Sequence, residues 1–329
     1  MIKDIVFKIG YDLGIHRLFN LSVVNKRIIM LCLHRVNPVN DPLFPRLHPN
    51  TFKKLIRLLK REYIIAGIQD LPALDMSGTF KKPVIVISFD DGYKDFIDYA
   101  MPVIDGEKVS VNHNIVVHSA DTGQLIWTQR LNNILSFLDK TGTPLNVTYE
   151  DYSFHPDPSW NIFQTKRELF KVMFGRPFPF ISGFTAAAEN KYSFLQPSHE
   201  MMNWDDIRTC KKAGVDIGSH TFYHSSLDHE GDPFFLNVEI KVSKSAIEKQ
   251  IASPVYSFAF PNGLMQQQAY DSSIDAGYQN LLLIDEVDYR HIALSTNGAN
   301  LFKRRLVGGH TSEYENIFNV VGLHKAFHF

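Results

Sequence analysis

The sequence predicts an α/β fold, an irregular barrel of parallel strands surrounded by helices. Three observations indicate this class. Short apolar runs such as residues 84–89, which begin with four consecutive β-branched residues, have the composition of strands buried on both faces. Segments with helical apolar spacing, such as 52–59 and 125–138, alternate with these runs. No internal repeat divides the 329 residues, and this length is ordinary for one α/β barrel.

Composition and charge indicate a globular protein and argue against nucleic-acid binding and a disulfide-rich fold. A hydrophobic content of 44% with 21% charged residues is typical of a globular protein that buries a full core. The formal net charge of −1 argues against a nucleic-acid partner held by phosphate neutralisation. The two cysteines, Cys32 and Cys210, are too few for a disulfide framework.

Residues 1–27 are predicted to form an N-terminal amphipathic helical segment. The first fourteen residues contain four charged side chains and no long apolar run, which indicates neither a secretory signal nor a membrane-spanning helix. We therefore expect a cytoplasmic protein. One helical face carries Ile2, Ile5, Ile9 and Leu13. This face either docks onto the body of the protein or lies on a membrane surface.

Two adjacent carboxylates follow the apolar run at 84–89, where Asp90 and Asp91 precede Gly92. The carboxyl ends of parallel strands are where barrels and open α/β sheets place their active sites. An acidic turn before the next helix would have the same composition, since Asp and Gly are common turn residues. The choice between these two interpretations depends on a partner elsewhere in the chain.

Such a partner is predicted at a second short β run, residues 215–219, which is followed by His220 and His224. On one helical turn, residues four positions apart lie on the same face, so both imidazoles could point at one cation. Two imidazoles and a carboxylate suit zinc and leave positions open for water and substrate. Because both polar groups follow buried strands, we expect them to share one site.

Three short motifs resemble those of the polysaccharide deacetylases, the NodB-homology family or carbohydrate esterase family 4. Ser-Phe-Asp-Asp-Gly at 88–92 and His-Thr-x-x-His at 220–224 are similar to the first two motifs. Phe-Ala-Phe-Pro-Asn-Gly at 258–263 is similar to the third, in the form found in poly-N-acetylglucosamine deacetylases. The resemblance runs from about residue 28 to residue 305 and is weak near 140–200. It implies a NodB-type barrel, seven-stranded, over residues 28–329.

The resemblance also implies roles for five site residues. Asp91, His220 and His224 would hold a divalent metal, with zinc expected and cobalt, nickel or manganese as alternatives. Asp90 would be the general base that takes a proton from the attacking water. The backbone N–H of Asn262 would stabilise the oxyanion.

A histidine and an arginine complete the implied site. Residues 27–36 are predicted to form a buried strand that ends in His34, and Leu-x-Leu-His resembles the final motif of the family, whose histidine is the general acid. Its N-terminal position matches the circular permutation of the poly-N-acetylglucosamine subgroup. Most members have an arginine in the third motif that braces the base, and Ala259 occupies that position here. Arg305 is the predicted replacement, with Arg304 as a close alternative.

Two further segments have open interpretations. Residues 140–202 are predicted to be an insertion that covers the barrel mouth or a plain surface excursion. Trp160 and Phe163, within it, could stack on sugar rings or pack. Residues 234–250 have the spacing of a helix, and its polar face carries Glu239, Ser243 and Lys244.

The sequence as a whole predicts a metal-dependent hydrolase of carbon–nitrogen bonds other than peptide bonds. Its substrate would be the N-acetyl group of an amino sugar in a polysaccharide, an oligosaccharide or a lipid-linked precursor of envelope polysaccharide. One alternative is a deformylase or another amidohydrolase that acts on a sugar conjugate. The other is a catalytically silent sugar-binding protein, although a binding module needs neither the base nor the acid.

Overall fold

A computed structural model describes residues 2–17, 28–73, 82–228, 232–285, 287–290, 292–293, 298–309 and 312–323. Within these residues, seven parallel strands form a closed barrel in the order β1–β10–β9–β8–β7–β4–β3, and β3 pairs with β1 to close it. The short strand β2 (Ile64–Ile65) extends the sheet outside the barrel on β3. The barrel strands are β1 (Ile29–Leu33), β3 (Val84–Phe89), β4 (Asn112–Ile115), β7 (Asp216–Ser219), β8 (Ser257–Ala259), β9 (Asn280–Ile284) and β10 (Asn300–Leu306). The predicted seven-stranded α/β barrel is confirmed.

The N-terminal strand β1 closes the barrel between the last strand and the strand that precedes the two carboxylates. Leu31 of β1 lies opposite Arg305 of β10 on one side and Ile87 of β3 on the other. Leu33 pairs with Phe89, so β1 and β3 end at the same level. This register places the residue after each strand at the same rim of the barrel, as the permuted final motif implies.

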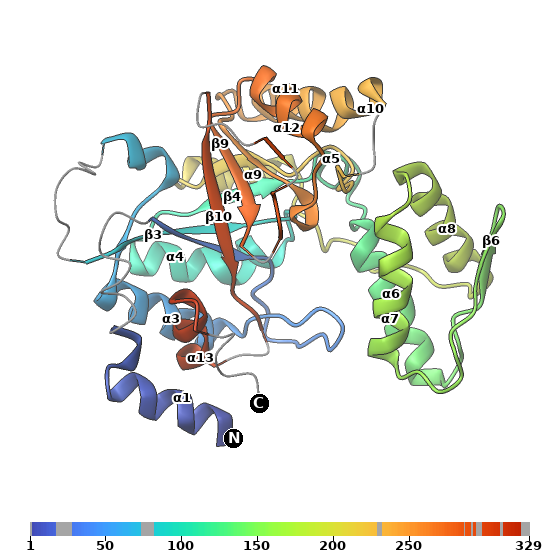
Figure 1. The fold of residues 1–329 in the computed structure, drawn as a ribbon, viewed down its shortest axis with the longest axis horizontal. Coiled ribbons are helices and arrows are strands. Elements are labelled where there is room, and N and C mark those ends of the chain that lie inside the picture. Colours follow the sequence, from blue (N-terminus) through green and yellow to red (C-terminus); the bar gives the residue numbers. More distant parts are fainter. Residues whose placement is uncertain are drawn as a thin grey trace.

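Helices surround the barrel and supply the outer layer of the core (Figure 1). In α3, which starts with Pro49, the buried side chains Phe52, Leu55, Ile56 and Leu59 form the predicted apolar stripe. The other helices of this layer are α4 (Met101–Glu107), α5 (Val117–Thr122), α9 (Trp204–Lys212), α10 (Pro233–Asn237), α11 (Ser243–Ile251), α12 (Gln267–Asp275) and α13 (Glu313–Val320), with α3 spanning Pro49–Glu62. Two π-helical turns, η2 (Phe96–Ala100) and η3 (Val238–Val242), and two 3₁₀ turns, η1 (Ile68–Ala73) and η4 (Pro261–Gly263), complete it.

The helix α1 (Ile2–Asp12) docks on the body of the protein through one face. Phe7 packs against Phe318 of α13, with ring centroids 5.2 Å apart. The opposite face is exposed and carries Ile5, Val6 and Ile9, followed by Leu13. Contact of this face with a membrane remains a prediction, and residues 18–27 of the predicted segment lie outside the described residues. Among the helices that the structure describes, none has the length and apolarity needed to span a bilayer.

A lobe of three helices and a hairpin lies beside the barrel, drawn in green at the right of Figure 1. It is built from α6 (Trp127–Thr141), β5 (Val147–Tyr149), β6 (Tyr152–Phe154), α7 (Ile162–Phe174) and α8 (Phe178–Lys191), between barrel strands β4 and β7. Its apolar core is separate from that of the barrel and includes Trp127, Leu135, Leu169, Met173 and Phe184. This separately packed part begins with α6, before the insertion predicted at 140–202.

Truncation of Phe184, whose ring is fully buried in the lobe, tests this division. We expect Phe184→Ala to destabilise the lobe by about 3–5 kcal/mol, because the cavity left in a packed core is only partly filled by relaxation. Amide hydrogen exchange should accelerate first in α6, α7 and α8, while the barrel strands keep their protection. Leu195→Ala, at an exposed position after α8, is the control, with an expected change within about 0.5 kcal/mol. Equal acceleration in barrel and lobe would show that the two form one cooperative unit.

Candidate functional site

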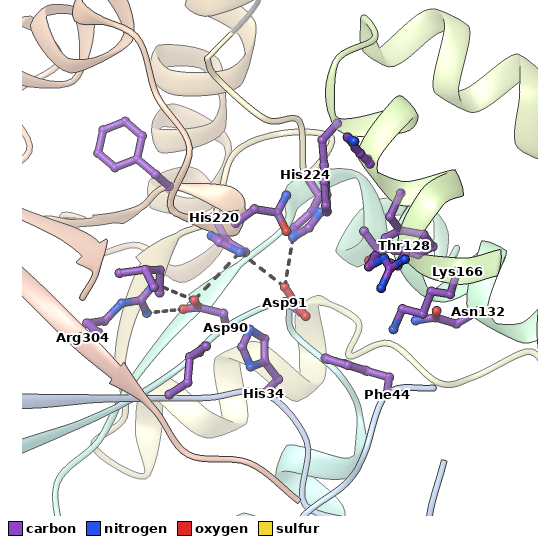
Figure 2. Close-up of a pocket in the computed structure, with 18 of the residues that line it drawn as sticks. His34, Phe44, Asp90, Asp91, Thr128, Asn132, Lys166, His220, His224 and Arg304 are labelled. Atoms are coloured by element: carbon purple, nitrogen blue, oxygen red, sulfur yellow. Dashed lines mark hydrogen bonds and ion pairs between the residues drawn. The ribbon is translucent and has the colours of Figure 1, made fainter. Parts of the chain in front are cut away.

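The turn after β3 sends two adjacent carboxylates to different partners. Asp91 adopts a left-handed backbone with φ of 78°, followed by Gly92 with φ of 85°. A non-glycine residue rarely adopts this conformation, and such residues gather at functional sites. Asp90 and Asp91 are both buried, and Figure 2 shows Asp90 next to Arg304 and Asp91 next to His224, with His220 near both carboxylates.

Asp91 lies between the two histidines. Its Oδ1 atom is 3.4 Å from Nε2 of His220 and 3.3 Å from Nε2 of His224. Ligand atoms bound tetrahedrally to one cation at about 2.1 Å lie about 3.4 Å apart, so the three atoms have the spacing of a metal ligand set. Burial alone would raise the pKa of Asp91, but the two imidazoles outweigh it and hold that pKa well below its usual value.

A hydrogen bond to the backbone fixes the orientation of the His220 ring. Its Nδ1 atom lies 2.8 Å from the carbonyl oxygen of Ala259, at the end of β8. A carbonyl oxygen can only accept, so Nδ1 carries the hydrogen and Nε2 presents its lone pair toward Asp91. The ligand atoms of Asp91, His220 and His224 lie within 4.8 Å of one another, so this donor set fits a divalent cation.

The two histidines do not lie on a helix, which corrects the prediction of one helical turn. Residues 220–226 form a loop after β7. Thr221 and His224 have left-handed backbone conformations with φ of 69° and 62°. These two residues curl the loop, and the curl brings the imidazoles together although the residues lack helical geometry. The two imidazoles do converge as predicted, but a curled loop and not a helical turn brings them together.

Glu239 holds this loop from the π-helical turn η3. Its Oε2 accepts hydrogen bonds from the backbone N–H groups of Phe222 and Tyr223, each at 3.0 Å, and its Oε1 accepts from Oγ of Ser225 at 3.1 Å. Glu239 is fully buried, and burial raises its pKa to about 7 although these donors oppose the shift. The predicted polar face at 234–250 is thus partly buried, because Glu239 and Ser243 point inward. Glu239 lies in a π-helical turn, and no simple sequence pattern identifies such a turn, so no sequence signal marks this contact.

Asp90 binds an arginine inside the barrel. Nη1 and Nη2 of Arg304 each donate to one of its carboxylate oxygens at 2.7 Å, and Nδ2 of Asn114 donates to Oδ1 at 2.7 Å. Sγ of Cys32 lies 3.4 Å from Oδ2. Burial alone would raise the pKa of Asp90, but the charge of Arg304 outweighs burial and holds that pKa far below its usual value.

The arginine beside Asp90 is Arg304 and not Arg305, which corrects the prediction. Successive side chains of a strand point to opposite faces. Arg304 on β10 points into the barrel and is 0% exposed. Arg305 points outward, where Nη1 contacts the carbonyl oxygen of Val320 and Nε lies 3.7 Å from Asp285.

A hydrogen-bonded layer inside the barrel supports this pair and was not foreseen. Oγ of Ser88 donates to Oδ1 of Asn112 and accepts from Asn114 and Arg304, at 3.0–3.1 Å. A Cβ atom at Gly218 would lie 2.0 Å from Oδ1 of Asn114, so glycine is required there for Asn114 to reach Asp90. The sequence signal for this layer was the polar run at 112–114, which is flanked by apolar residues and yet belongs to a buried strand.

One cavity of about 770 Å³ is lined by both carboxylates, both histidines and the buried arginine, together with His34 and Asn262. His34 is half-buried at the end of β1, and its ring centroid lies 5.6 Å from that of Phe44. Potential ligand atoms of His34, Cys32 and Asp90 lie within 4.8 Å of one another. Asn262, after β8, has a left-handed backbone with φ of 56°, and its side-chain amide donates to Oγ of Ser226 at 3.2 Å. The predicted site residues therefore converge, apart from Arg305 (Figure 2).

Comparison with known proteins gives a family match and structural neighbours. Residues 185–281 match the family model "Polysaccharide deacetylase", a range that includes the second and third motifs but not Asp90 or Asp91. The deacetylase PplD from Streptococcus pyogenes, solved with acetate, has a TM-score of 0.58 at 16% identity, over 89% of this chain and 97% of that one. A comparison with curated proteins found no match.

Two further solved structures share the fold. IcaB from Ammonifex degensii gives a TM-score of 0.53 at 14% identity, over 89% of this chain and 96% of that one. A de-N-acetylase from Aggregatibacter actinomycetemcomitans gives 0.53 at 15% identity, over 89% and 99%. The family match confirms the resemblance to the polysaccharide deacetylases over residues 185–281, and with it the prediction of a deacetylase-type hydrolase domain. The solved structures confirm the fold.

The two neighbouring arginines offer a matched test of the buried pair. We expect Arg304→Met to lower the free energy of unfolding by about 3–5 kcal/mol, because it leaves the buried charge of Asp90 without its partner. Arg305→Met removes a partly exposed ion pair and one backbone contact, and we expect a loss of about 1 kcal/mol. Urea denaturation followed by circular dichroism measures both. Similar losses for the two variants would contradict the assignment.

Proposed function

We propose that this chain, which carries a polysaccharide deacetylase domain, is a divalent-metal-dependent hydrolase that removes the acetyl group from an N-acetylated amino sugar of a glycan. One observation supports this above all. The Asp91–His220–His224 cluster shares a cavity with the Asp90–Arg304 pair, and His34 lines the same cavity. A catalytically silent binding protein would have no use for this combination of a ligand set, a buried base and a titratable acid.

The metal would be held by Asp91, His220 and His224. Two imidazoles and one carboxylate favour zinc, and cobalt, nickel and manganese accept the same donors. When bound, the metal supplies Lewis-acid polarisation and lowers the pKa of water. Oδ1 of Asp91 is buried, and within the described part of the chain it has no hydrogen-bond donor, so this oxygen is available to a cation.

Asp90 would act as the general base. Its pKa is held low by Arg304, so it is ionised throughout the working pH range and can accept a proton from the attacking water. Arg304 and Asn114 fix both carboxylate oxygens, and Oδ2 lies 4.0 Å from Nε2 of His220. The carboxylate is therefore positioned next to the ligand set before any substrate arrives.

His34 and Asn262 would complete the reaction. Water adds to the amide carbonyl, the backbone N–H of Asn262 stabilises the oxyanion, and the carbon–nitrogen bond then breaks. His34 donates a proton to the departing nitrogen, which leaves as the amine while acetate remains. His34 lies on the rim beside Asp90, so an acid and a base are present on adjacent strand ends.

Release of acetate from N-acetylglucosamine oligomers by the zinc-loaded protein tests this proposal. We expect Asp90→Asn to reduce kcat by about 10²–10⁴-fold, the usual contribution of a general base, and removal of the metal with a chelator to abolish release. Asp98→Asn, at a surface position of the following π-helical turn, is the matched control and should retain activity. Acetate release that is equal in Asp90→Asn and the parent protein would refute the mechanism.

Glu239 provides a separate prediction about the metal. We expect Glu239→Gln to weaken zinc binding by about 10- to 100-fold, because the loop that carries His220 and His224 loses a carboxylate that accepts three hydrogen bonds. Competition against a fluorescent zinc chelator measures this affinity without any substrate. Asp275→Asn, at an exposed position of α12, is the control. Unchanged zinc affinity in Glu239→Gln would show that the loop keeps its shape without that carboxylate.

A further inference from the structure

The lobe helix α7 presents one face to the cavity, and this face is both basic and aromatic. Its residues recur at helical spacing of three and four positions and all line the cavity: Phe163, Lys166, Arg167, Phe170, Lys171 and Phe174. The acidic residues that line the cavity within the described part are Asp90 and Asp91, which belong to the barrel. Figure 2 shows Lys166 on the far side of the cavity from Asp90 and Arg304.

Stability of the helix does not account for this face. Arg167 and Lys171 are four positions apart, and like charges at this spacing destabilise a helix. A cation in the last turn, such as Lys171, favours the helix dipole, but Lys166 and Arg167 lie farther from that end. The side chain of Phe163 is 55% exposed at the cavity, where an aromatic ring stays in contact with water. This combination of clustered positive charge and an exposed aromatic ring is typical of a surface that binds a ligand.

The three cations are largely available to a ligand. Arg167 pairs with its neighbour Glu168 at 2.9 Å, and both side chains are too exposed for this pair to contribute much. Nζ of Lys166 donates to the carbonyl oxygen of Leu43, which uses one of its three hydrogens. Among the described residues, no acidic side chain forms an ion pair with Lys166 or Lys171.

A buried amide of the neighbouring lobe helix α6 also points to a ligand. Asn132 of α6 lines the cavity and is 3% exposed. Its Oδ1 atom has no hydrogen-bond donor within the part of the chain that the structure describes. A buried acceptor without a donor is unfavourable unless a ligand or water supplies one. A sugar hydroxyl group supplies such a donor, so Asn132, which lies beside Lys166 in Figure 2, would contact the sugar near the cations.

We propose that the substrate is a phosphate-linked N-acetylated sugar, with its acetamido group at the barrel site and its phosphate on Lys166, Arg167 and Lys171. This inference rests on the hydrolase proposed above and specifies its substrate class. Lysine and arginine give phosphate charge-assisted hydrogen bonds. The exposed ring of Phe163 would pack on the group beyond the phosphate, which is either a nucleoside or an apolar lipid carrier, while Phe170 and Phe174 pack on Trp127 and form the cavity wall.

Calorimetric titration of the zinc-loaded Asp90→Asn protein tests this assignment without turnover. Three probes separate the sources of the phosphate: UDP-N-acetylglucosamine, N-acetylglucosamine linked to farnesyl diphosphate, and neutral triacetylchitotriose. The test variant adds Arg167→Gln and Lys171→Gln, and leaves Lys166 in place because it joins the lobe to Leu43. The control adds Lys140→Gln and Lys249→Gln, which remove the same charge from exposed positions that do not line the cavity.

We expect at least one phosphate probe to bind about tenfold or more tightly than the neutral trisaccharide. The test variant should weaken that binding about 10- to 100-fold and the control variant should not. A rise in ionic strength from about 50 to about 300 mM should weaken the phosphate probe and leave the trisaccharide unaffected. The probe that binds identifies the carrier as nucleotide or lipid.

Two results would overturn the inference: the trisaccharide binding as tightly as both phosphate probes, or phosphate binding that is the same in the test and control variants. Acetate release by the parent protein separates this failure from failure of the hydrolase. Release from the trisaccharide with no charge-dependent binding leaves the hydrolase and removes the phosphate site. Charge-dependent binding with no release from any probe supports the phosphate site and removes the hydrolase.

Discussion

The site depends on a buried ion pair, the one between Asp90 of the β3 turn and Arg304 of β10. Two charges removed from water must satisfy all their hydrogen-bonding groups, because an unpaired charge in a barrel interior is strongly unfavourable. Ser88 and Asn114 take part in the same network, and Gly218 leaves the space that Asn114 needs. The closed barrel holds these strands at fixed distances. Asp91 and the histidine loop are then positioned relative to a carboxylate whose two oxygens are held by Arg304 and Asn114.

Much of the fold and most of the candidate site could be predicted, since both depend on local patterns. Continuous apolar runs indicate parallel strands, and polar residues directly after them gather at one rim whatever their separation in sequence. Asp91, His220 and His224 were found in this way, and three motifs joined them to a family. His34 was found because it directly follows the apolar run of β1, in a pattern that resembles the final motif of the family.

The errors concern contacts that no local pattern determines. Lys303, Arg304 and Arg305 are all cationic, so no alternation of polar and apolar residues shows which side chain points inward, and a shift of one residue reverses the answer. Glu239 was placed on the polar face of a helix because its hydrogen-bond partners lie 14 to 17 positions earlier in the chain. They belong to a loop whose shape depends on two residues with left-handed backbone conformations. The lobe was predicted to begin too late because α6 has the same apolar spacing as a barrel helix, although it packs on a different core.

That separate core has a consequence for how such proteins diversify. The lobe is inserted between β4 and β7 and has an apolar core of its own. It touches the histidine loop through Trp127, whose ring contacts Phe170 of α7 and whose Nε1 donates to the carbonyl oxygen of His224 at 3.0 Å. On the proposed assignment, the reaction chemistry and the carrier-binding cations lie in different structural units of one polypeptide. Substitution of the exposed cations Arg167 and Lys171, which belong to the lobe surface, would then change substrate preference while the barrel residues stay the same.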